Sequence, residues 1–359
     1  MKVVCFHLYN DFSGSPKVLR MVLEGLTEKD IHVELVTSRG SGALSDLTEY
    51  GVRIFTYPYR FSQNPILTMI RYVGVQFYLF FFALRYAFNR QTVFYINTIL
   101  PVGAAIAGRL IGKQVIYHYH ENAFVKGSFY KLLARTMQML ASQIICVSEY
   151  QRSFLRRQED VRVVPNAVPV DFMQRLFPSP NEAFNRRRIL MLGSLKRYKG
   201  TCEFMDLAKL LPDYLFELVL NETAENVALF GQEHQIGSIR NLTVYSRQCD
   251  VAPFYNRASV VVNLTDKNLA IETFGLTALE AMSAGLPVIV PTVGGIAEMV
   301  EDGVNGYRID GSDLECIAEH IRHLLSDRAL YCQLSENALH VAHKYDEQAM
   351  IDTITSFIH

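Results

Sequence analysis

Several features that mark other classes of protein are missing from this sequence of 359 residues. The six cysteines are scattered without a Cys-x-x-Cys pair, which argues against a disulfide framework and predicts a reducing, cytosolic compartment. The first residues, MKVVCFHLYND, contain one basic residue and an apolar run too short for a signal peptide, so we interpret them as a buried strand. There is no short repeat and no low-complexity tract.

A long uninterrupted apolar run is also missing. The most apolar segment, residues 66–88, is broken by Arg71 and Arg85, which leaves about 13 residues where roughly 20 are needed to span a bilayer. We therefore expect no transmembrane helix. Aromatic residues and flanking arginines suit a helix at a membrane interface, but a helix packed between a sheet and its neighbours has the same pattern, and we favour the buried helix.

The balanced net charge of −1 conceals an asymmetry between the two halves. Residues 1–170 contain 19 Lys and Arg against 11 Asp and Glu, whereas residues 171–359 contain 16 against 25. A basic first half predicts a contact with something anionic, such as a phospholipid surface or a phosphate-bearing acceptor, and ordinary surface variation is the alternative. Nothing in the sequence indicates a nucleic-acid partner.

The length predicts two domains, and half of the residues are hydrophobic, as in folded globular proteins. Short apolar runs alternate with longer amphipathic segments, the pattern of a parallel, doubly wound α/β sheet. Strands are expected at residues 3–8, 32–36, 53–57, 92–96, 114–117, 143–147 and 162–164 in the first half, and at 188–192, 215–220, 242–245, 259–263 and 287–290 in the second.

The phrase VVPNAVPVDF, around Pro165 and Asn166, ends the first series of strands because its prolines break regular structure. We expect an N-terminal Rossmann-like domain over residues 1–170 and a C-terminal Rossmann-like domain over 171–340. Residues 341–359 should form a C-terminal helix that crosses back to the first domain. Such sheets bind ligands at the carboxyl ends of their strands, so the two domains are expected to face each other across a cleft.

The most informative stretch is ETFGLTALEAM, which begins at Glu272. Phe274 and Gly275 lead into a predicted helix that contains Glu280, and a helix start favours a bound anion. A carboxylate further along that helix can accept hydrogen bonds from ribose hydroxyls. The alternative is that Glu272 lies in an ordinary turn and Glu280 on a solvated helix face.

This stretch resembles the E-x7-E signature of the retaining glycosyltransferases of family 4, and AGLPVIVPTVGGIAEMVEDGVNGY after it resembles the same family. The resemblance implies a GT-B fold and a hexosyltransferase that takes its sugar from a nucleotide diphosphate, UDP by family frequency. It makes residues 1–170 the acceptor-side domain and residues 171–340 the nucleotide-sugar-binding domain. It also implies that Glu272 contacts the donor sugar and Glu280 the ribose. Backbone amides near Phe274, Gly275 and Leu276 would hold the diphosphate.

The phrase MLGSLKRYKG resembles the family's G-R-x4-K-G loop, with Lys199 and Gly200 at the matching positions. Ser194 stands where an arginine is usual, and a hydroxyl cannot replace a guanidinium. Either Lys196 or Arg197 reaches the diphosphate instead, or its binding relies on Lys199 and the helix end. A basic surface turn is the alternative reading of this loop.

Two segments of the first half resemble the family as well. NDFSGSPKVL resembles a glycine-containing loop of the acceptor side, and we count its Gly14 with the donor-binding candidates. In YHYHENAF, His120 matches a histidine that lies near the donor sugar in related enzymes, whereas His118 is expected to be structural. Ser148 is expected to cap a helix. With Glu272 and Lys199, His120 completes the catalytic candidates.

There is no Asp-x-Asp triplet and no clustered His or Cys, so we expect neither a metal nor a cofactor beyond the nucleotide-sugar substrate. The resemblance implies a glycan acceptor, which we expect to be lipid-linked, in the assembly of bacterial surface polysaccharide such as lipopolysaccharide or O-antigen. The protein would then be cytoplasmic and peripheral on the inner face of the membrane.

Three alternatives remain at this point. A nucleotide-sugar epimerase shares the fold and would bind the same donor, although the E-x7-E phrase argues against it. A NAD-dependent oxidoreductase should show G-x-G-x-x-G after its first strand, and SGSP does not supply it. A sugar-binding module without catalysis would not need the full set of donor-site motifs.

Overall fold

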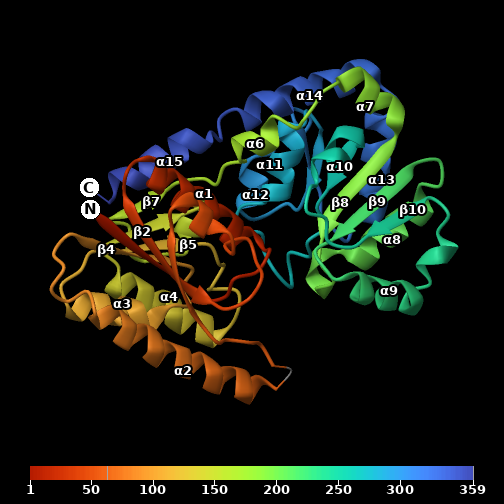
Figure 1. Ribbon diagram of the computed structural model, residues 1–359. Coiled ribbons are helices and arrows are strands. Elements are labelled where there is room, and N and C mark those ends of the chain that lie inside the picture. The colour runs from red at the N-terminus through yellow and green to blue at the C-terminus, as the bar shows by residue number, and fades with distance from the viewer. Residues whose placement is uncertain (63, 359) are drawn as a thin grey trace. The chain divides into compact units, whose positions relative to one another are not determined.

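The computed structural model describes residues 1–62 and 64–358. The chain forms two compact units, which we call the N-terminal unit (residues 1–166 together with the segment from 347 onwards) and the C-terminal unit (residues 167–346). The sequence pattern predicts these boundaries at 170/171 and 340/341. Each unit is built around one parallel sheet (Figure 1).

The N-terminal unit contains a seven-stranded sheet in the order β3-β2-β1-β4-β5-β6-β7, with every pair of neighbours parallel. Its strands are β1 (Lys2–His7), β2 (His32–Ser38), β3 (Arg53–Tyr57), β4 (Thr92–Asn97), β5 (Val115–Tyr119), β6 (Gln143–Cys146) and β7 (Val161–Val163). Its helices are α1 (Gly14–Glu28), α2 (Pro65–Leu84), α3 (Val102–Leu110), α4 (Ser128–Leu140), α5 (Glu149–Ser153) and α15 (Glu347–Ser356), with a 3₁₀ turn at Leu47–Tyr50.

Helices cover both faces of this sheet, with α2, α3 and α4 on one face and α1 on the other (Figure 1). Helix α3 fits closely between its neighbours because it contains two glycines. A Cβ at Gly108 would lie 2.7 Å from the ring of Phe94 on β4, and a Cβ at Gly103 would lie 2.1 Å from the carbonyl oxygen of Gln76 on α2. Helix α3 therefore packs closely against both the sheet and α2.

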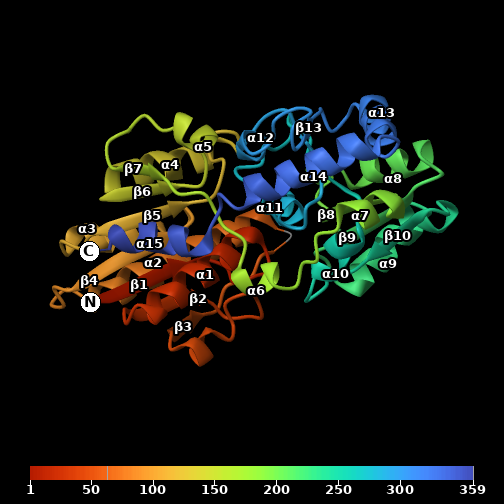
Figure 2. The ribbon, with the colours of Figure 1, turned by 90° about the horizontal axis from the view of Figure 1, so that it is seen from above.

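Helix α15 returns to the N-terminal unit and lies beside α1 (Figure 2). Gly25 on α1 makes room for Ile351, whose side chain would lie 2.5 Å from a Cβ at that position. Lys29 and Asp352 form an ion pair at 2.5 Å across the same two helices. Residues far apart in sequence thus complete one core.

The C-terminal unit repeats the doubly wound arrangement with six parallel strands in the order β10-β9-β8-β11-β12-β13. The strands are β8 (Arg188–Gly193), β9 (Leu215–Leu220), β10 (Leu242–Tyr245), β11 (Val260–Val262), β12 (Val288–Val290) and β13 (Gly306–Arg308). The helices are α6 (Val170–Met173), α7 (Pro180–Arg186), α8 (Thr201–Leu210), α9 (Ala224–Glu233), α10 (Ala252–Arg257), α11 (Leu276–Ser283), α12 (Gly295–Glu298), α13 (Leu314–Leu324) and α14 (Arg328–Ala342), with 3₁₀ turns at Arg197–Lys199 and Ile236–Ser238.

The two parallel Rossmann-like sheets confirm the predicted fold class. One strand, β13, was not predicted, because three residues next to a glycine-rich turn give no periodic signal. The preference for a buried helix over residues 66–88 was wrong. Helix α2 buries only Tyr72, Val75, Leu79, Phe82 and Ala83, and much of its outer surface is exposed and apolar.

Candidate donor site

Three loops of the C-terminal unit carry the candidate donor residues, and each follows a strand. Residues 194–200 follow β8, residues 263–275 follow β11, and residues 291–295 follow β12. These strands are neighbours in the sheet and run parallel, so their carboxyl ends lie at one edge. The topology brings together three motifs that are spread over about a hundred residues of sequence.

Lys199 and Glu272 form an ion pair at the centre of this group. Lys199 Nζ donates to Glu272 Oε1 at 2.5 Å, and Thr265 Oγ1 donates to the same oxygen at 2.9 Å. Burial raises the pKa of Glu272, but the Lys199 ammonium and the hydrogen bonds outweigh it, so the pKa lies below its ordinary value. Burial likewise lowers the pKa of Lys199, and Glu272 raises it above its ordinary value. Both groups are therefore charged at neutral pH.

Two glycines fix the backbone around this pair. Gly200 has a positive φ of 75°, and a Cβ there would lie 2.3 Å from the carbonyl oxygen of Leu264. Gly294 has φ 107°, and a Cβ there would lie 2.5 Å from the carbonyl oxygen of Glu272, which also accepts a hydrogen bond from the amide of Gly295 at 2.9 Å. Only glycine fits at these two positions, because it has no Cβ to clash with the carbonyl oxygen and because other residues rarely adopt a positive φ.

Gly275 and the residues beside it form the start of α11. Gly275 is the N-cap residue with φ 99°, and Leu276 is the first residue of the helix. A Cβ at Gly275 would lie 2.4 Å from Ile296, so this helix start packs against α12. Phe274 is buried, with its ring 5.8 Å from that of Tyr345. The first amides of α11 are the type of backbone donor that binds a phosphate.

Glu280 lies on α11, as the sequence predicted, and Glu272 precedes the helix. Tyr255 on α10 donates its hydroxyl to Glu280 Oε2 at 2.6 Å. Burial, together with the Glu280 carboxylate, raises the pKa of Tyr255 well above its ordinary value, which keeps the hydroxyl as a donor. A carboxylate oriented in this way can accept hydrogen bonds from a ribose.

The structure separates the two basic candidates beside Ser194. Both side chains are exposed, but Arg197 forms an ion pair with Glu203 on α8 at 2.6 Å, and Lys196 immediately precedes the 3₁₀ turn Arg197–Lys199. Ser194 contributes its carbonyl oxygen, which accepts from Thr201 Oγ1 at 3.1 Å. Lys196 is thus the better candidate for a second positive charge.

The N-terminal candidates gather at the carboxyl edge of the first sheet. Asn97, the last residue of β4, contacts both His7 at the end of β1 and His120 after β5. It also donates to the carbonyl oxygen of Ser15 at 3.5 Å, next to Gly14, the first residue of α1. Gly14 and His120 are therefore placed around one asparagine that the sequence analysis did not single out.

The hydrogen bonds show which ring nitrogen carries the proton in His7 and in His120. His7 Nε2 lies 2.9 Å from the carbonyl oxygen of Tyr9, which can only accept, so Nε2 carries the proton. His7 Nδ1 then accepts from Asn97 Nδ2 at 3.0 Å, because burial lowers the pKa of His7 to about 4. Asn97 Oδ1 therefore accepts from His120 Nε2, also at 3.0 Å. His120 is held as the tautomer with its proton on Nε2.

Two neighbours of His120 complete this cluster. His118 is fully buried, shares a hydrogen bond of 2.7 Å with Tyr95, and has its ring 4.0 Å from that of His120. Burial lowers the pKa of His118 to about 3. Burial also lowers the pKa of His120 well below its ordinary value, and the nearby His118 and His7 lower it further. Burial raises the pKa of Glu121, which accepts from the amide of Ile99. Ser148 caps α5 through the amide of Gln151, as predicted.

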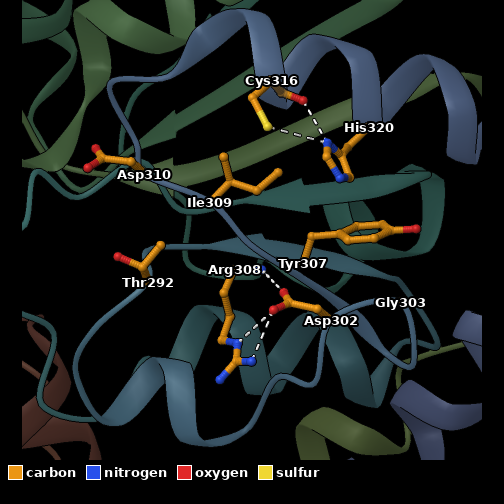
Figure 3. Close-up of a pocket in the computed structure, with 9 residues that line it drawn as sticks. All are labelled: Thr292, Asp302, Gly303, Tyr307, Arg308, Ile309, Asp310, Cys316 and His320. Atoms are coloured by element: carbon orange, nitrogen blue, oxygen red, sulfur yellow. Dashed lines mark hydrogen bonds and ion pairs between the residues drawn. The ribbon is translucent and has the colours of Figure 1, made fainter.

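A separate hollow of about 460 Å³ lies beside β13 and α13 (Figure 3). Some of its polar groups bond to one another: Asp302 pairs with Arg308 at 3.0 Å, and His320 Nδ1 donates to the carbonyl oxygen of Cys316 at 2.8 Å. None of the predicted donor residues lines it. Among residues 1–62 and 64–358, no group of three or more His, Cys, Asp or Glu side chains is arranged to hold a metal ion.

Two doubly wound units with a basic loop, a carboxylate and a helix start at one strand edge define a nucleotide-binding protein of the GT-B fold class. Sequence comparison agrees: the family "Glycosyl transferases group 1" matches residues 173–341, and "Glycosyltransferase Family 4" matches residues 12–172. The chain belongs to glycosyltransferase family 4, whose retaining enzymes use nucleotide-sugar donors.

A curated relative is the D-inositol 3-phosphate glycosyltransferase of Xylanimonas cellulosilytica, 30% identical over 219 residues, which are 53% of this chain and 49% of the relative. The chain spans about half or less of the length of this relative and of several others that it matches.

Solved structures show the same fold over the whole chain. HepE of Anabaena, in complex with UDP and glucose, superposes with a TM-score of 0.80 at 18% identity, covering 100% of this chain and 99% of that one. WaaG, a glycosyltransferase involved in lipopolysaccharide biosynthesis, gives a TM-score of 0.68 at 18% identity, with the same coverage.

Proposed function

We propose that this enzyme transfers a hexose from a UDP-sugar to a lipid-linked glycan acceptor, with retention of anomeric configuration and without a metal ion. The observation that carries the proposal is the Lys199–Glu272 pair beside the start of α11. UDP is supported by the Anabaena protein, whose structure holds UDP with glucose.

Donor binding would exchange the partners of this pair. A diphosphate at the start of α11 offers Lys199 a stronger anionic partner than one carboxylate, and the ammonium has three donors to share. Glu272, which keeps its hydrogen bond from Thr265, would then accept from a hydroxyl of the donor sugar. Glu280 would bind the ribose, and Lys196 would supply further positive charge.

In the reaction, the bond between the anomeric carbon and the phosphate oxygen breaks, and its electron pair leaves with UDP. The acceptor hydroxyl oxygen bonds to the anomeric carbon on the face that the phosphate leaves, and its proton passes to the departing phosphate. Lys199 and the amides of α11 stabilise the negative charge that develops on the leaving group. His120 would position the sugar or polarise a hydroxyl, and no residue is assigned as a nucleophile.

The acceptor and its setting are also part of the proposal. The basic first half of the chain suits a lipid-linked acceptor at the inner face of a bacterial cytoplasmic membrane, in the assembly of lipopolysaccharide, O-antigen or a related surface polysaccharide. The fold shared with WaaG is compatible with that setting. The enzyme would act as a peripheral membrane protein.

Calorimetric titration with UDP, GDP and NAD in the presence of EDTA tests the donor site. We expect UDP to bind, and Glu280→Ala to weaken binding by about tenfold or more, because charge-assisted hydrogen bonds to the ribose are lost. Arg197→Gln is the matched control, since its side chain is engaged with Glu203, and should bind UDP as the wild type does. Binding of NAD without a nucleoside diphosphate would contradict the proposal.

A further inference from the structure

Helix α2 carries a second apolar face that the N-terminal unit does not cover. Its inner face packs through residues such as Val75, Leu79 and Phe82. The outer face carries Ile66, Ile70, Val73, Phe77 and Phe81, which are 71%, 62%, 44%, 62% and 64% exposed. Their spacing of four, three, four and four residues places them in one line along the helix, and we call this line the outer stripe. A helix at a water-facing surface normally has polar residues there.

The sequence around the outer stripe is strongly basic, with almost no acidic residues. Residues 50–148 contain a single acidic residue, Glu121, whose carboxylate accepts from the backbone of Ile99. The same segment contains nine exposed Lys and Arg side chains. Arg71 lies on α2, where it donates to the carbonyl oxygen of Arg60 at 3.0 Å, and Arg85 ends the helix with its guanidinium 4.3 Å from the ring of Phe82.

We propose that α2 lies in the plane of an anionic lipid bilayer, with the outer stripe among the acyl chains and the basic residues at the headgroups. Apolar burial and attraction to anionic lipid act together in helices of this type. Among the described residues, α2 is the helix that is long and apolar enough to cross a membrane by length and composition, but its inner face contributes to the core of the unit. The helix therefore lies on the surface of the bilayer and does not span it.

The charge distribution favours a bilayer over a second copy of the chain. In a symmetric dimer the same surface meets itself, so the basic residues around one stripe would face those around the other. Like charges with few carboxylates to pair with would oppose such a contact, whereas phosphate headgroups would be attracted. The proposal shares its membrane setting with the proposed function but does not depend on the transferase chemistry.

Flotation with vesicles, without donor or acceptor, tests the surface directly. The full chain should float with vesicles of phosphatidylcholine and phosphatidylglycerol in equal parts, and much less with phosphatidylcholine alone. Phe77→Ser with Phe81→Ser should weaken binding roughly tenfold or more, because two exposed rings can no longer enter the bilayer. Phe177→Ser is the matched control, since Phe177 is 72% exposed in the C-terminal unit. It should float as the wild type does.

A second variant removes charge and leaves the stripe intact. Replacing Lys126, Lys131 and Arg135 with Gln should reduce binding to the anionic vesicles and make the remaining binding less sensitive to salt. Thermal unfolding of each variant checks that the fold is intact, and UDP titration checks the donor site. A variant that passes both but binds vesicles less has lost only the membrane-binding surface. A wild-type protein that does not float, or a double-serine variant that floats equally well, would overturn the proposal. If light scattering showed that the wild type is a dimer and the double-serine variant a monomer, the outer stripe would be assigned to contact with a second copy instead.

Discussion

Single residues set the electrostatic state of both candidate regions. Lys199 and Glu272 keep each other charged, whereas burial keeps His7 and His120 neutral and Asn97 fixes the tautomer of each ring. The first pair could be anticipated from the resemblance of two motifs. Asn97 could not, because one polar residue at the end of an apolar strand has many ordinary explanations, and its two partners come from other strands.

Asn97→Asp tests the arrangement of the two histidines. A carboxylate between the rings favours the protonated imidazoles, so the pKa values of His7 and His120 should rise. In the wild type their lowered pKa values make the unfolded state bind more protons, so stability falls as the pH drops from 6.5 to the His7 value of about 4. This fall should be shallower in the variant, although burial of the carboxylate should cost about 1–3 kcal/mol at neutral pH.

Nitrogen-detected NMR of the histidine rings, together with chemical denaturation between pH 4 and 7, measures both effects. The wild-type spectrum should show His7 and His120 neutral with the proton on Nε2. Histidine titrations that are the same in the two proteins would mean that Asn97 does not bridge these rings.

At the scale of elements, the glycine turns decide where the Glu272 carboxylate lies. Gly294 has a positive φ and also packs directly on the backbone of Glu272, whereas Gly303 has a positive φ of 73° and open space around it. The two positions therefore separate backbone strain from steric contact within one unit.

Gly294→Ala should destabilise the C-terminal unit by about 2–4 kcal/mol, combining strain with displacement of Glu272, and should weaken UDP-sugar binding. Gly303→Ala should cost only about 1 kcal/mol, from strain alone, and leave binding intact. Denaturant unfolding and calorimetry measure the two quantities. Equal losses in both variants would show that the contact with Glu272 contributes nothing.

The sequence predicted most of the elements but not all of their environments. Twelve strands were expected from apolar β-branched runs, and the structure contains all of them, since a strand buried on both faces must be apolar. The face that α2 exposes was not predicted, because apolar composition is the same whether a helix is covered by protein or not. The choice between Lys196 and Arg197 also needed coordinates, because it depends on Glu203 in the first turn of α8.

At the scale of the whole molecule, the N-terminal unit depends on a segment from the far end of the sequence. Ile351 on α15 is buried against α1, next to Gly25. Ile351→Ala should therefore lower the stability of the N-terminal unit by about 2–4 kcal/mol, through lost burial and a cavity. The C-terminal unit does not contain this residue and should keep its stability.

Calorimetric scanning with UDP present distinguishes the two units, because the ligand raises the transition of the unit that binds it. Only the transition that UDP does not raise should move in Ile351→Ala. Asp352→Ala is the control, since its ion pair with Lys29 is exposed and should matter little. A shift of the UDP-sensitive transition would show that α15 supports the other unit.

The return of α15 also sets an order on synthesis. Residues 167–346 are continuous in sequence and can fold as soon as they leave the ribosome, whereas the N-terminal unit needs residues that are made after all of them. Until α15 emerges, the groove beside Gly25 on α1 has no occupant, and the unit that is begun first is finished last. Nascent chains stalled before residue 347 should therefore contain a completed C-terminal unit and an incomplete N-terminal unit.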